Sequence, residues 1–190
     1  QHDLTQYDLS ALRHVPSAGE AINPEVIHTF RRQTGLTVME GYGQTETTLM
    51  IANLDGSTPK AGCMGKPTPL YDVALWDEDG EESDYGEIIV HADRDVCNFG
   101  IFSSYYQDDA LYGQVWEGGV YHTGDIARRD ADGYYCYVGR KDDIIKSSGY
   151  RIGPFEVENI LMQHESVLEC AVTGVPDEIR GMVVKAFVVL

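Results

Sequence analysis

A glycine-containing segment in the first quarter of the chain has residue types that suit a phosphate. In Gly41-Tyr42-Gly43-Gln44-Thr45-Glu46, two glycines let backbone amides approach a phosphate closely, and the Thr45 hydroxyl can donate to a phosphate oxygen. The Glu46 carboxylate can hold a Mg²⁺ that bridges phosphates, and the Tyr42 ring offers a flat face for a purine. The alternative is structural: a glycine turn between a strand and a helix, with Thr45 as N-cap and Glu46 in the first turn.

Two later segments have groups that suit the rest of a nucleotide. Asp125, in Tyr121-His122-Thr123-Gly124-Asp125, can accept both hydroxyls of a ribose, although an aspartate after glycine is more often a turn residue. Arg140 and Arg151 follow or flank glycine turns, and a guanidinium matches a phosphate with two donors. The alternative for each arginine is an ion pair with a surface carboxylate.

The elements that position the first segment form a β-α-β unit. A short strand is expected at residues 12–15, and a helix follows from Pro24, with Asn23 as its cap, to Gly35. The next strand is expected at residues 36–39 and leads into the loop of residues 40–46. Ligands of open α/β sheets bind at such strand ends.

Short strands broken by turn residues follow and predict a β-rich region. Strands are expected at residues 73–76, 86–91, 120–123 and 134–138, with hairpins at Asp79-Gly80 and Asp132-Gly133. The acidic residues between Asp77 and Glu87 are expected to form a solvated loop.

After residues 140–143 the pattern changes to that of a second, small α+β domain. A strand is expected at residues 144–146, then a Ser-Ser-Gly turn and a helix over residues 154–164 with Val157, Ile160 and Leu161 on one face. Strands at residues 167–175 and 183–190 are expected to be separated by Pro176-Asp177.

The composition excludes several classes of protein. With 190 residues, 43% hydrophobic and 24% charged, the chain is expected to fold rather than to be disordered. A net charge of -17 argues against nucleic acid and anionic membrane surfaces as partners, and no apolar run has the length of a membrane-spanning helix. The start at Gln1 and the apolar run at residues 183–190 predict a fragment of a longer protein.

The cysteines and the missing leader indicate a compartment. Cys63, Cys97, Cys136 and Cys170 are scattered without a Cys-x-x-Cys pair, which predicts neither a zinc site nor a tight disulfide framework. No basic-then-apolar leader precedes the first strand. A reducing cytoplasm is therefore expected.

Taken in order, the motifs resemble those of the adenylate-forming superfamily, and most closely the medium-chain type of AMP-forming acyl-CoA synthetase. The likeness covers essentially the whole chain and includes residues 99–106 and 180–190, whose sequences resemble those of this subgroup. The ordered motifs are Ser17-Ala18-Gly19-Glu20, residues 41–46, Gly86-Glu87-Ile88-Ile89-Val90, residues 121–125, Gly139-Arg140-Lys141-Asp142-Asp143 and residues 148–158.

The resemblance implies a nucleotide site and assigns residues to it. Tyr42 would stack on adenine, Asp125 would hold the ribose hydroxyls, and Thr45 and Glu46 would be catalytic, Thr45 at the phosphate and Glu46 on Mg²⁺. The full set implied to bind ATP or AMP is Gly19, Glu20, Ala21, Glu40, Gly41, Tyr42, Gly43, Gln44, Thr45, Asp125, Arg140 and Arg151.

The resemblance also implies a two-step reaction and a mobile C-terminal part. A carboxylic acid attacks ATP to give an acyl-adenylate and pyrophosphate, and the thiol of coenzyme A then displaces AMP. Residues 1–140 would end a large α/β nucleotide-binding domain, comprising an α/β part (1–60) and a β-rich subdomain (61–140). Residues 141–143 would be a hinge at Lys141-Asp142, and residues 144–190 would start a small α+β domain. Ser148, Gly149, Tyr150 and Arg180 would contact coenzyme A.

The acid is expected to be longer than acetate. Gly19 and Gly43 would line the acyl pocket, and acetate-selective members have a tryptophan at the position of Gly43, so the glycine leaves volume open. Each further buried methylene is worth about 0.8 kcal/mol. On this basis Gly43→Trp is expected to shift preference toward acetate or propionate.

Three alternatives remain open from the sequence. A carrier-protein-loading adenylation domain and an aryl-acid CoA ligase share the loop and the Thr-Gly-Asp motif, and a module that binds the nucleotide without turnover shares the site. The family's phosphate loop would precede Gln1 and its adenylation lysine would follow Leu190. The 190 residues alone are therefore expected not to catalyse the first half-reaction, and the sequence indicates no oligomeric state.

Overall fold

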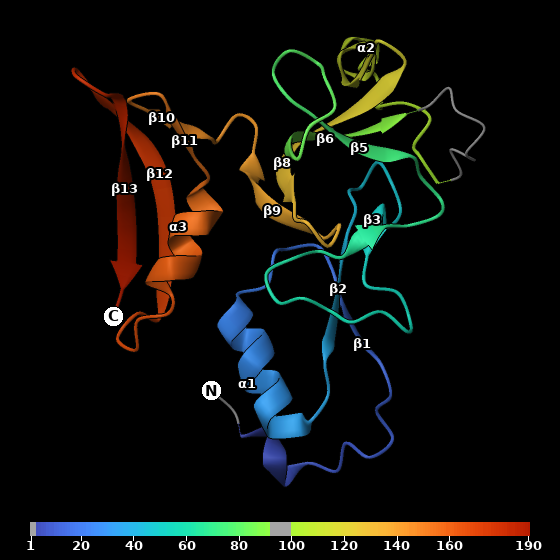
Figure 1. The fold of residues 1–190 in the computed structure, drawn as a ribbon, viewed down its shortest axis with the longest axis vertical. Helices are drawn as coiled ribbons and strands as arrows, with labels where there is room; N and C mark the ends of the chain where they lie inside the picture. The colour runs from blue at the N-terminus through green and yellow to red at the C-terminus, as the bar shows by residue number, and fades with distance from the viewer. Residues whose placement is uncertain (1–2, 92–99) are drawn as a thin grey trace.

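The computed structural model describes residues 3–91 and 100–190, which form three sheets and few helices (Figure 1). Cys97 lies outside the described residues, as does Phe99, the first residue of the segment 99–106 that resembles the subgroup's sequence. In the described residues no helix has the length and apolarity needed to span a bilayer. The mixed α/β and α+β class predicted from the sequence is confirmed.

The first sheet contains the predicted β-α-β unit. Its strand order is β1-β2-β3-β4, with β1 (Val15–Ser17) parallel to β2 (Val38–Tyr42), and β3 (Ile51–Ala52) and β4 (Lys66–Pro67) antiparallel. A 3-10 helix, η1 (Leu4–Gln6), precedes it. Helix α1 (Pro24–Thr34) connects β1 to β2, and it begins where Asn23 Oδ1 accepts from the Glu25 amide at 2.8 Å. It ends at Gly35, whose φ of 72° suits glycine.

Both parallel strands of this unit lie closer to the C-terminus than predicted, at Val15–Ser17 instead of residues 12–15 and at Val38–Tyr42 instead of residues 36–39. The strand expected at residues 36–39 continues through Tyr42, because Gly41 and Tyr42 pair with Ala52 and Ile51 of β3. Part of the segment predicted to be a loop is therefore sheet, and the loop proper begins at Gly43. Strand pairing, which local sequence does not contain, moves the boundary.

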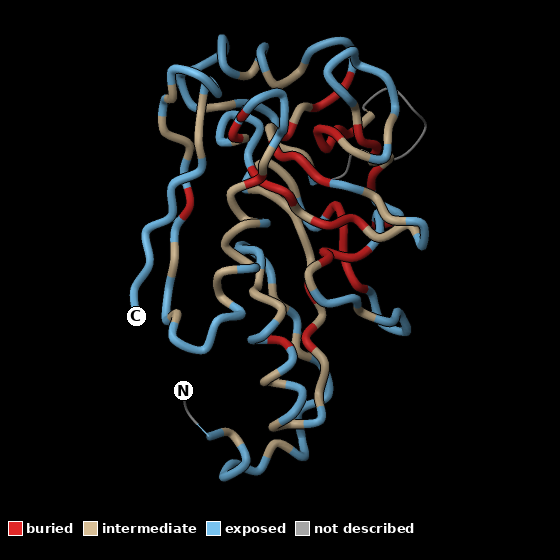
Figure 2. Tube along the Cα trace, turned by 60° about the vertical axis from the view of Figure 1, so that its left-hand side comes forward, coloured by how far each residue is buried: buried red, intermediate tan, exposed pale blue. Residues whose placement is uncertain are grey.

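The second sheet holds most of the core. Its order is β5-β6-β8-β7, with β9 on the other side of β8. The strands are β5 (Val73–Trp76), β6 (Tyr85–His91), β7 (Trp116–Glu117), β8 (Val120–Arg129) and β9 (Tyr135–Arg140), and α2 (Asp109–Val115), which the sequence analysis missed, precedes β7. Ile88, Ile89 and Val90 of β6 are fully buried, so both faces of this strand are covered. Figure 2 shows the buried segments concentrated here and in the first sheet, with few in the C-terminal part.

The third sheet has the order β11-β10-β13-β12 and lies beside α3 (Figure 1). The elements are β10 (Ile145–Ser147), β11 (Tyr150–Ile152), α3 (Pro154–Leu161), β12 (Glu169–Asp177) and β13 (Gly181–Val189).

Two local predictions for this region are wrong. The helix ends at Leu161 instead of residue 164. Of the three residues predicted to share one helix face, Val157 and Leu161 are half-buried and Ile160 is 68% exposed. Pro176 and Asp177 belong to β12, because they pair with Met182 and Gly181 of the neighbouring strand. The turn lies one step later, where Asp177 Oδ1 accepts from the amides of residues 179 and 180.

One cysteine pair contradicts the sequence expectation. Cys63 and Cys136 form a disulfide that joins the segment before β4 to β9 across 73 residues of sequence, whereas Cys170 is a free thiol. Both bonded cysteines are 5% exposed. Sequence spacing did not reveal the pair because the contact is made by tertiary packing.

Replacing both Cys63 and Cys136 with serine is expected to lower the free energy of unfolding by about 2–4 kcal/mol, because the unfolded chain loses a crosslink between distant residues. Urea unfolding under non-reducing conditions measures the difference. Cys170→Ser, which removes a cysteine outside the disulfide, serves as the matched control. Equal unfolding midpoints for the wild type and the double variant would show that the crosslink does not stabilise the fold.

A glycine in β6 is required by close approach of the neighbouring strand. A Cβ at Gly86 would collide with the backbone carbonyl of Trp76 in β5, whereas a Cβ at Gly113 in α2 would meet nothing within 4 Å. Gly86→Ala is expected to destabilise the chain by about 3 kcal/mol. Gly113→Ala is expected to stabilise it by about 0.5–1 kcal/mol, since alanine favours a helix. Thermal unfolding of the two variants checks the contrast, which equal shifts would contradict.

Candidate nucleotide-binding site

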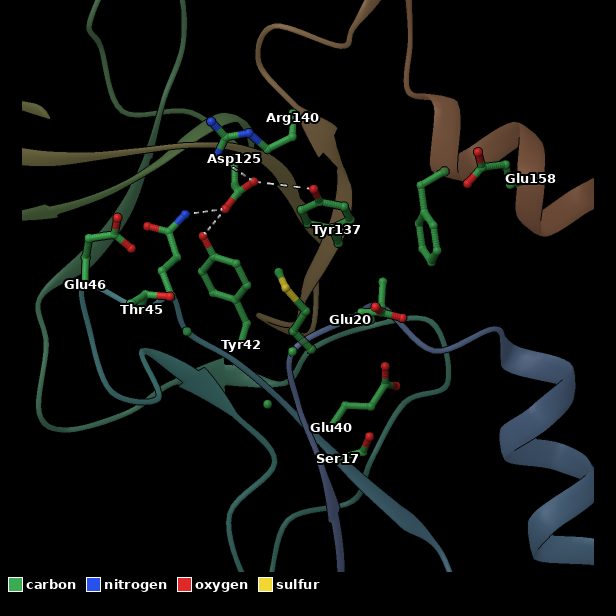
Figure 3. A pocket seen from close by; sticks show the side chains of 17 residues that line it. Ser17, Glu20, Glu40, Tyr42, Thr45, Glu46, Asp125, Tyr137, Arg140 and Glu158 are labelled. Atoms are coloured by element: carbon green, nitrogen blue, oxygen red, sulfur yellow. Dashed lines mark hydrogen bonds and ion pairs between the residues drawn. The ribbon is translucent and has the colours of Figure 1, made fainter. Parts of the chain in front are cut away.

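A cavity of about 620 Å³ lies between the first two sheets and helix α3 (Figure 3). Figure 3 shows Tyr42, Tyr137 and Arg140 converging on Asp125, with Thr45 and Glu46 on one side of this group and Glu158 on the other. The lining residues are Ser17, Gly19, Glu20, Ala21, Glu40, Gly41, Tyr42, Gly43, Gln44, Thr45, Glu46, Met64, Asp125, Tyr137, Arg140, Phe155 and Glu158.

The loop after β2 is built from turns and is not the start of a helix. The Gln44 amide donates to Thr47 Oγ1 at 2.9 Å, the Thr47 amide donates to the Gln44 carbonyl at 3.1 Å, and the Met50 amide returns to the Tyr42 carbonyl at 2.8 Å. The chain therefore turns back into β3. The structural alternative for Thr45 and Glu46, an N-cap and first helical turn, is wrong for this chain.

Asp125 is the centre of the hydrogen-bond network in the cavity. It is 5% exposed, and its Oδ2 accepts from Tyr42 Oη and from Gln44 Nε2, both at 2.6 Å. Gln44 is itself held, because its Nε2 also donates to the Thr123 carbonyl at 2.9 Å and its Oε1 accepts from Tyr121 Oη at 2.8 Å. These contacts fill the acceptor capacity of Oδ2 and fix the direction of the carboxylate.

The other oxygen of Asp125 has only long contacts. Tyr137 Oη and Arg140 Nη1 each lie 3.4 Å from Oδ1, beyond the usual range of a strong charged hydrogen bond. Arg140 donates more closely to the Thr123 carbonyl, at 3.0 Å. Oδ1 therefore retains capacity to accept from a hydroxyl of a ligand in the cavity.

The tyrosines around Asp125 remain hydrogen-bond donors. Burial, and then the charge of Asp125, raise the pKa of Tyr42 well above its usual value, and the same two causes raise the pKa of Tyr137. Burial also raises the pKa of Tyr121. Protonated phenols satisfy the carboxylate, so the arrangement is electrostatically consistent.

Glu46 points toward the cavity with one oxygen held by a tyrosine. Tyr105 Oη donates to Glu46 Oε1 at 2.8 Å, and burial followed by this carboxylate raises the pKa of Tyr105 to about 12. The Phe102 amide donates to the Glu46 carbonyl at 2.7 Å, which fixes the backbone. A carboxylate oriented in this way and next to a hydroxyl suits a hard divalent cation.

Glu40 is the second buried acid of the cavity. It is 9% exposed, and burial raises its pKa to about 7, although the Ile22 amide lowers it in part. Its main-chain carbonyl accepts from the Asn53 amide at 2.9 Å and from Asn53 Nδ2 at 3.0 Å. The sequence analysis assigned this residue to the adenosine loop but did not anticipate its titration near neutral pH.

All but one of the residues assigned to ATP or AMP lie around this cavity. The exception is Arg151, whose guanidinium pairs with Glu78 of the acidic hairpin instead of lining the cavity. Arg151 therefore forms the ion pair with a surface carboxylate that the sequence analysis gave as the alternative to a phosphate contact. The sequence analysis did not assign Ser17, Met64, Tyr137, Phe155 and Glu158, which also line the cavity. Tyr137 and Phe155 contact each other across a ring-centroid distance of 5.8 Å, and no local motif signals that meeting.

The residues assigned to coenzyme A lie together but outside the cavity. Ser148 and Gly149 form the turn between β10 and β11, with φ values of 50° and 83°. The Ser148 amide donates to the Arg180 carbonyl at 3.0 Å, and Tyr150 is 74% exposed. The left-handed backbone explains the glycine at position 149, where a Cβ would meet nothing within 4 Å.

The structure changes the outcome expected from Gly43→Trp. A Cβ at Gly43 would collide with the Thr48 carbonyl oxygen, which belongs to the returning side of the same loop. A tryptophan there would displace residues 44–50 before it filled an acyl pocket. The substitution is therefore expected to disturb the whole loop and is not a clean test of acid length.

Relatives of the chain were found in sequence and in structure. A rat protein named acyl-coenzyme A synthetase ACSM3, mitochondrial, is 48% identical over 193 residues, covering 100% of this chain and 33% of the relative. A Bacillus subtilis protein named uncharacterized acyl-CoA ligase YtcI is 47% identical over 190 residues, covering 98% of this chain and 35% of the relative. The chain thus spans about a third of the length of the curated relatives it matches.

A solved structure agrees in fold over nearly the whole chain. The anthranilate CoA ligase AuaEII in complex with anthranoyl-AMP superposes with a TM-score of 0.86 at 35% identity, covering 99% of this chain and 36% of that chain. The family described as AMP-binding enzyme matches residues 1–106, and the AMP-binding enzyme C-terminal domain matches residues 156–190. The chain belongs to the AMP-binding enzyme family.

Proposed function

We propose that this chain supplies the adenylate-binding site of an AMP-forming acyl-CoA synthetase. One observation carries the proposal: eleven residues assigned to ATP or AMP, together with Glu46, line one cavity, although they come from four separate parts of the chain. Relatives named acyl-CoA synthetases and a structural neighbour that holds an acyl-adenylate support it. Because the chain spans a third of those relatives, the activity is proposed for the protein that contains it.

In this proposal Asp125 binds the ribose. Its Oδ1 accepts a ribose hydroxyl, while Tyr42 and Gln44 hold Oδ2 and keep the carboxylate aimed at the cavity. Arg140 lies beside it and stabilises negative charge on the nucleotide. The Tyr42 ring stacks on adenine in this assignment, and the Thr45 hydroxyl donates to the phosphate.

Glu46 is the proposed ligand of Mg²⁺. The fit rests on its position at the cavity and on Tyr105, which donates to one carboxylate oxygen, while the other oxygen accepts no hydrogen bond from the described residues. When bound, Mg²⁺ supplies neutralisation of charge on the phosphate oxygens during adenylation. Tyr105 and the backbone of Glu46 keep the carboxylate directed at the place where that charge develops.

The second half-reaction is proposed to use the C-terminal part. Residues 141–143 lie in the connection between β9 and β10 and form the proposed hinge between a part ending at residue 140 and a part beginning at residue 144. The Ser148-Gly149-Tyr150 turn and Arg180 lie on that second part and are the proposed contacts of coenzyme A. Arg151 becomes a phosphate contact in this scheme only when its ion pair with Glu78 is broken.

The substrate is proposed to be a short- to medium-chain acid longer than acetate. An aryl acid is the second candidate, because the anthranilate CoA ligase is among the structural neighbours. A carrier-protein-loading role stays the third alternative. A cytoplasmic location stays a prediction, while the rat relative is named as mitochondrial.

The test is a substrate panel on the full-length product of the gene. Acids from acetate to decanoate, with benzoate and anthranilate, are supplied with ATP, Mg²⁺ and coenzyme A, and pyrophosphate and acyl-CoA are both measured. Coupled release of pyrophosphate and formation of acyl-CoA with an aliphatic acid supports the proposal. Acyl-adenylate formation without transfer to coenzyme A would favour a carrier-protein partner, and no pyrophosphate release with any acid would reject the synthetase.

A further inference from the structure

Glu87 of β6 is a buried carboxylate outside the cavity, and it contacts the Gly124 segment of β8, residues 123–125, where the pairing of β6 and β8 shifts register. Its side chain is 7% exposed, and its Oε1 accepts from the Gly124 amide at 2.9 Å. Its Oε2 accepts from Lys141 Nζ at 2.8 Å, and His122 Nδ1 lies 3.2 Å from the same oxygen. One carboxylate thus joins three points that are 35 to 54 residues away in the sequence.

The partners of Glu87 favour its charged form. Burial by itself raises the pKa of this carboxyl, but hydrogen bonds from His122, Lys141 and the Gly124 amide lower it to about 2. A buried charge is tolerated only when such donors surround it. If one donor is lost, the buried charge of Glu87 is no longer fully compensated by the remaining donors. The contacts of Glu87 are therefore expected to depend on one another.

The Gly124 segment is also in contact with Arg140. Gly124 has a φ of 70°, and a Cβ there would lie 2.8 Å from Arg140 Nη2, so this part of β8 packs closely against the Arg140 guanidinium while its amide donates to Glu87. The Lys141 amide donates to the Gly124 carbonyl at 2.8 Å. Gly124 and Lys141 are therefore joined twice, once through the backbone and once through the Glu87 carboxylate.

We propose that Glu87 is a positioning residue, which holds the Gly124 segment of β8 so that Asp125 faces the cavity and holds Lys141 in place at the start of the proposed hinge. The proposal has two halves. The nucleotide half, that Glu87 keeps Asp125 directed at the cavity for AMP binding, rests on the proposed function. The anchoring half, that Glu87 holds Gly124 and Lys141, depends only on the contacts of Glu87 described above. A movement of the C-terminal part that displaces the Lys141 side chain must break its contact with Glu87, which links that movement to the geometry of the ribose site.

The anchoring half is tested without any ligand, by hydrogen exchange of the Gly124 and Lys141 amides in the 190-residue chain. Glu87→Gln and Lys141→Met are each expected to speed exchange of these two amides by about tenfold, because the charged hydrogen bonds are lost. Lys141→Arg, which keeps a cationic donor, is expected to restore wild-type exchange. The side chain of Lys141 is 61% exposed, so both lysine variants are expected to fold.

The matched control lies on the same hairpin. Glu82→Gln removes a glutamate that pairs with Arg129 at 3.4 Å and is 59% exposed. It is expected to leave both amides unchanged. Unchanged exchange in Glu87→Gln and Lys141→Met, or equal acceleration at all amides of the sheet, would overturn the anchoring role.

The nucleotide half is tested by calorimetry with AMP on the full-length product of the gene. Glu87→Gln is expected to lower the affinity for AMP about tenfold, while the affinity of Glu82→Gln is expected to stay within twofold of the wild type. Wild-type affinity in Glu87→Gln, with its amides exchanging faster, would overturn the link between the anchor and the ribose site. No AMP binding by the wild type itself would reject the proposed function, and the exchange experiment would still decide the anchoring role.

Discussion

Replacing Asp125 with asparagine is expected to weaken AMP binding by about 100-fold, since hydrogen bonds to a charged group are worth about 1.5–3 kcal/mol each. Asparagine keeps the shape of the side chain, but its amide must face a donor. Oδ2 accepts from Tyr42 and Gln44, so an NH₂ at that position would oppose two donors. If the amide turns around, the NH₂ replaces Oδ1, the oxygen proposed to accept from the ribose.

Calorimetry with AMP on the full-length product of the gene measures this effect. Asp132→Asn is the matched control, because Asp132 is an aspartate near the end of the same hairpin, is 75% exposed and only approaches Lys60 at 3.6 Å. The control is expected to bind AMP like the wild type. An affinity for Asp125→Asn within threefold of the control would show that this carboxylate does not bind the ribose.

Replacing Glu40 with glutamine is expected to stabilise the chain at high pH and much less at low pH. The pKa of Glu40 is raised to about 7 in the folded state from an ordinary value of 4.5, because the carboxylate is buried. The folded state therefore keeps its proton while the unfolded state releases it between these two values. Stability falls as pH rises through this range, and above pH 7 the folded state carries the full cost of a buried charge.

The expected gain for Glu40→Gln is on the order of 3 kcal/mol at pH 8 and about 1 kcal/mol at pH 5.5, from about 1.4 kcal/mol for each pKa unit. Urea unfolding of both chains at the two pH values measures it. Glu117→Gln, which replaces an exposed glutamate of β7, is expected to give the same small difference at both. A Glu40→Gln gain that does not grow with pH would show that Glu40 is not the titrating group.

The two expected results concern opposite kinds of buried acid in one cavity. Asp125 is surrounded by donors that hold its charge in place, whereas Glu40 has a single backbone amide to oppose the cost of burial. A charge without sufficient donors is costly in the folded chain, and sites of ligand binding are where such costs are common. The stability gain expected from Glu40→Gln would therefore identify a part of the cavity that is not optimised for folding alone.

The sequence by itself predicted which residues would gather around one site, because they occur in short continuous motifs. Residues 19–21 and 40–46, with Asp125 and Arg140, line the cavity as the motif order implied. Helix α1 was also determined locally, since Asn23, Pro24 and Gly35 act within a few residues of its ends. Such signals need no knowledge of what packs against them.

The tertiary structure alone decided how these motifs meet. Tyr42 reaches Asp125 across 83 residues, Glu87 reaches Lys141 across 54, and Cys63 reaches Cys136 across 73. Strand β8 pairs with both β6 and β9, and the register of these pairings brings Glu87 next to the Gly124 segment of β8 and Arg140 opposite Asp125. Register and packing depend on all strands of a sheet at once, so no single segment of sequence contains them.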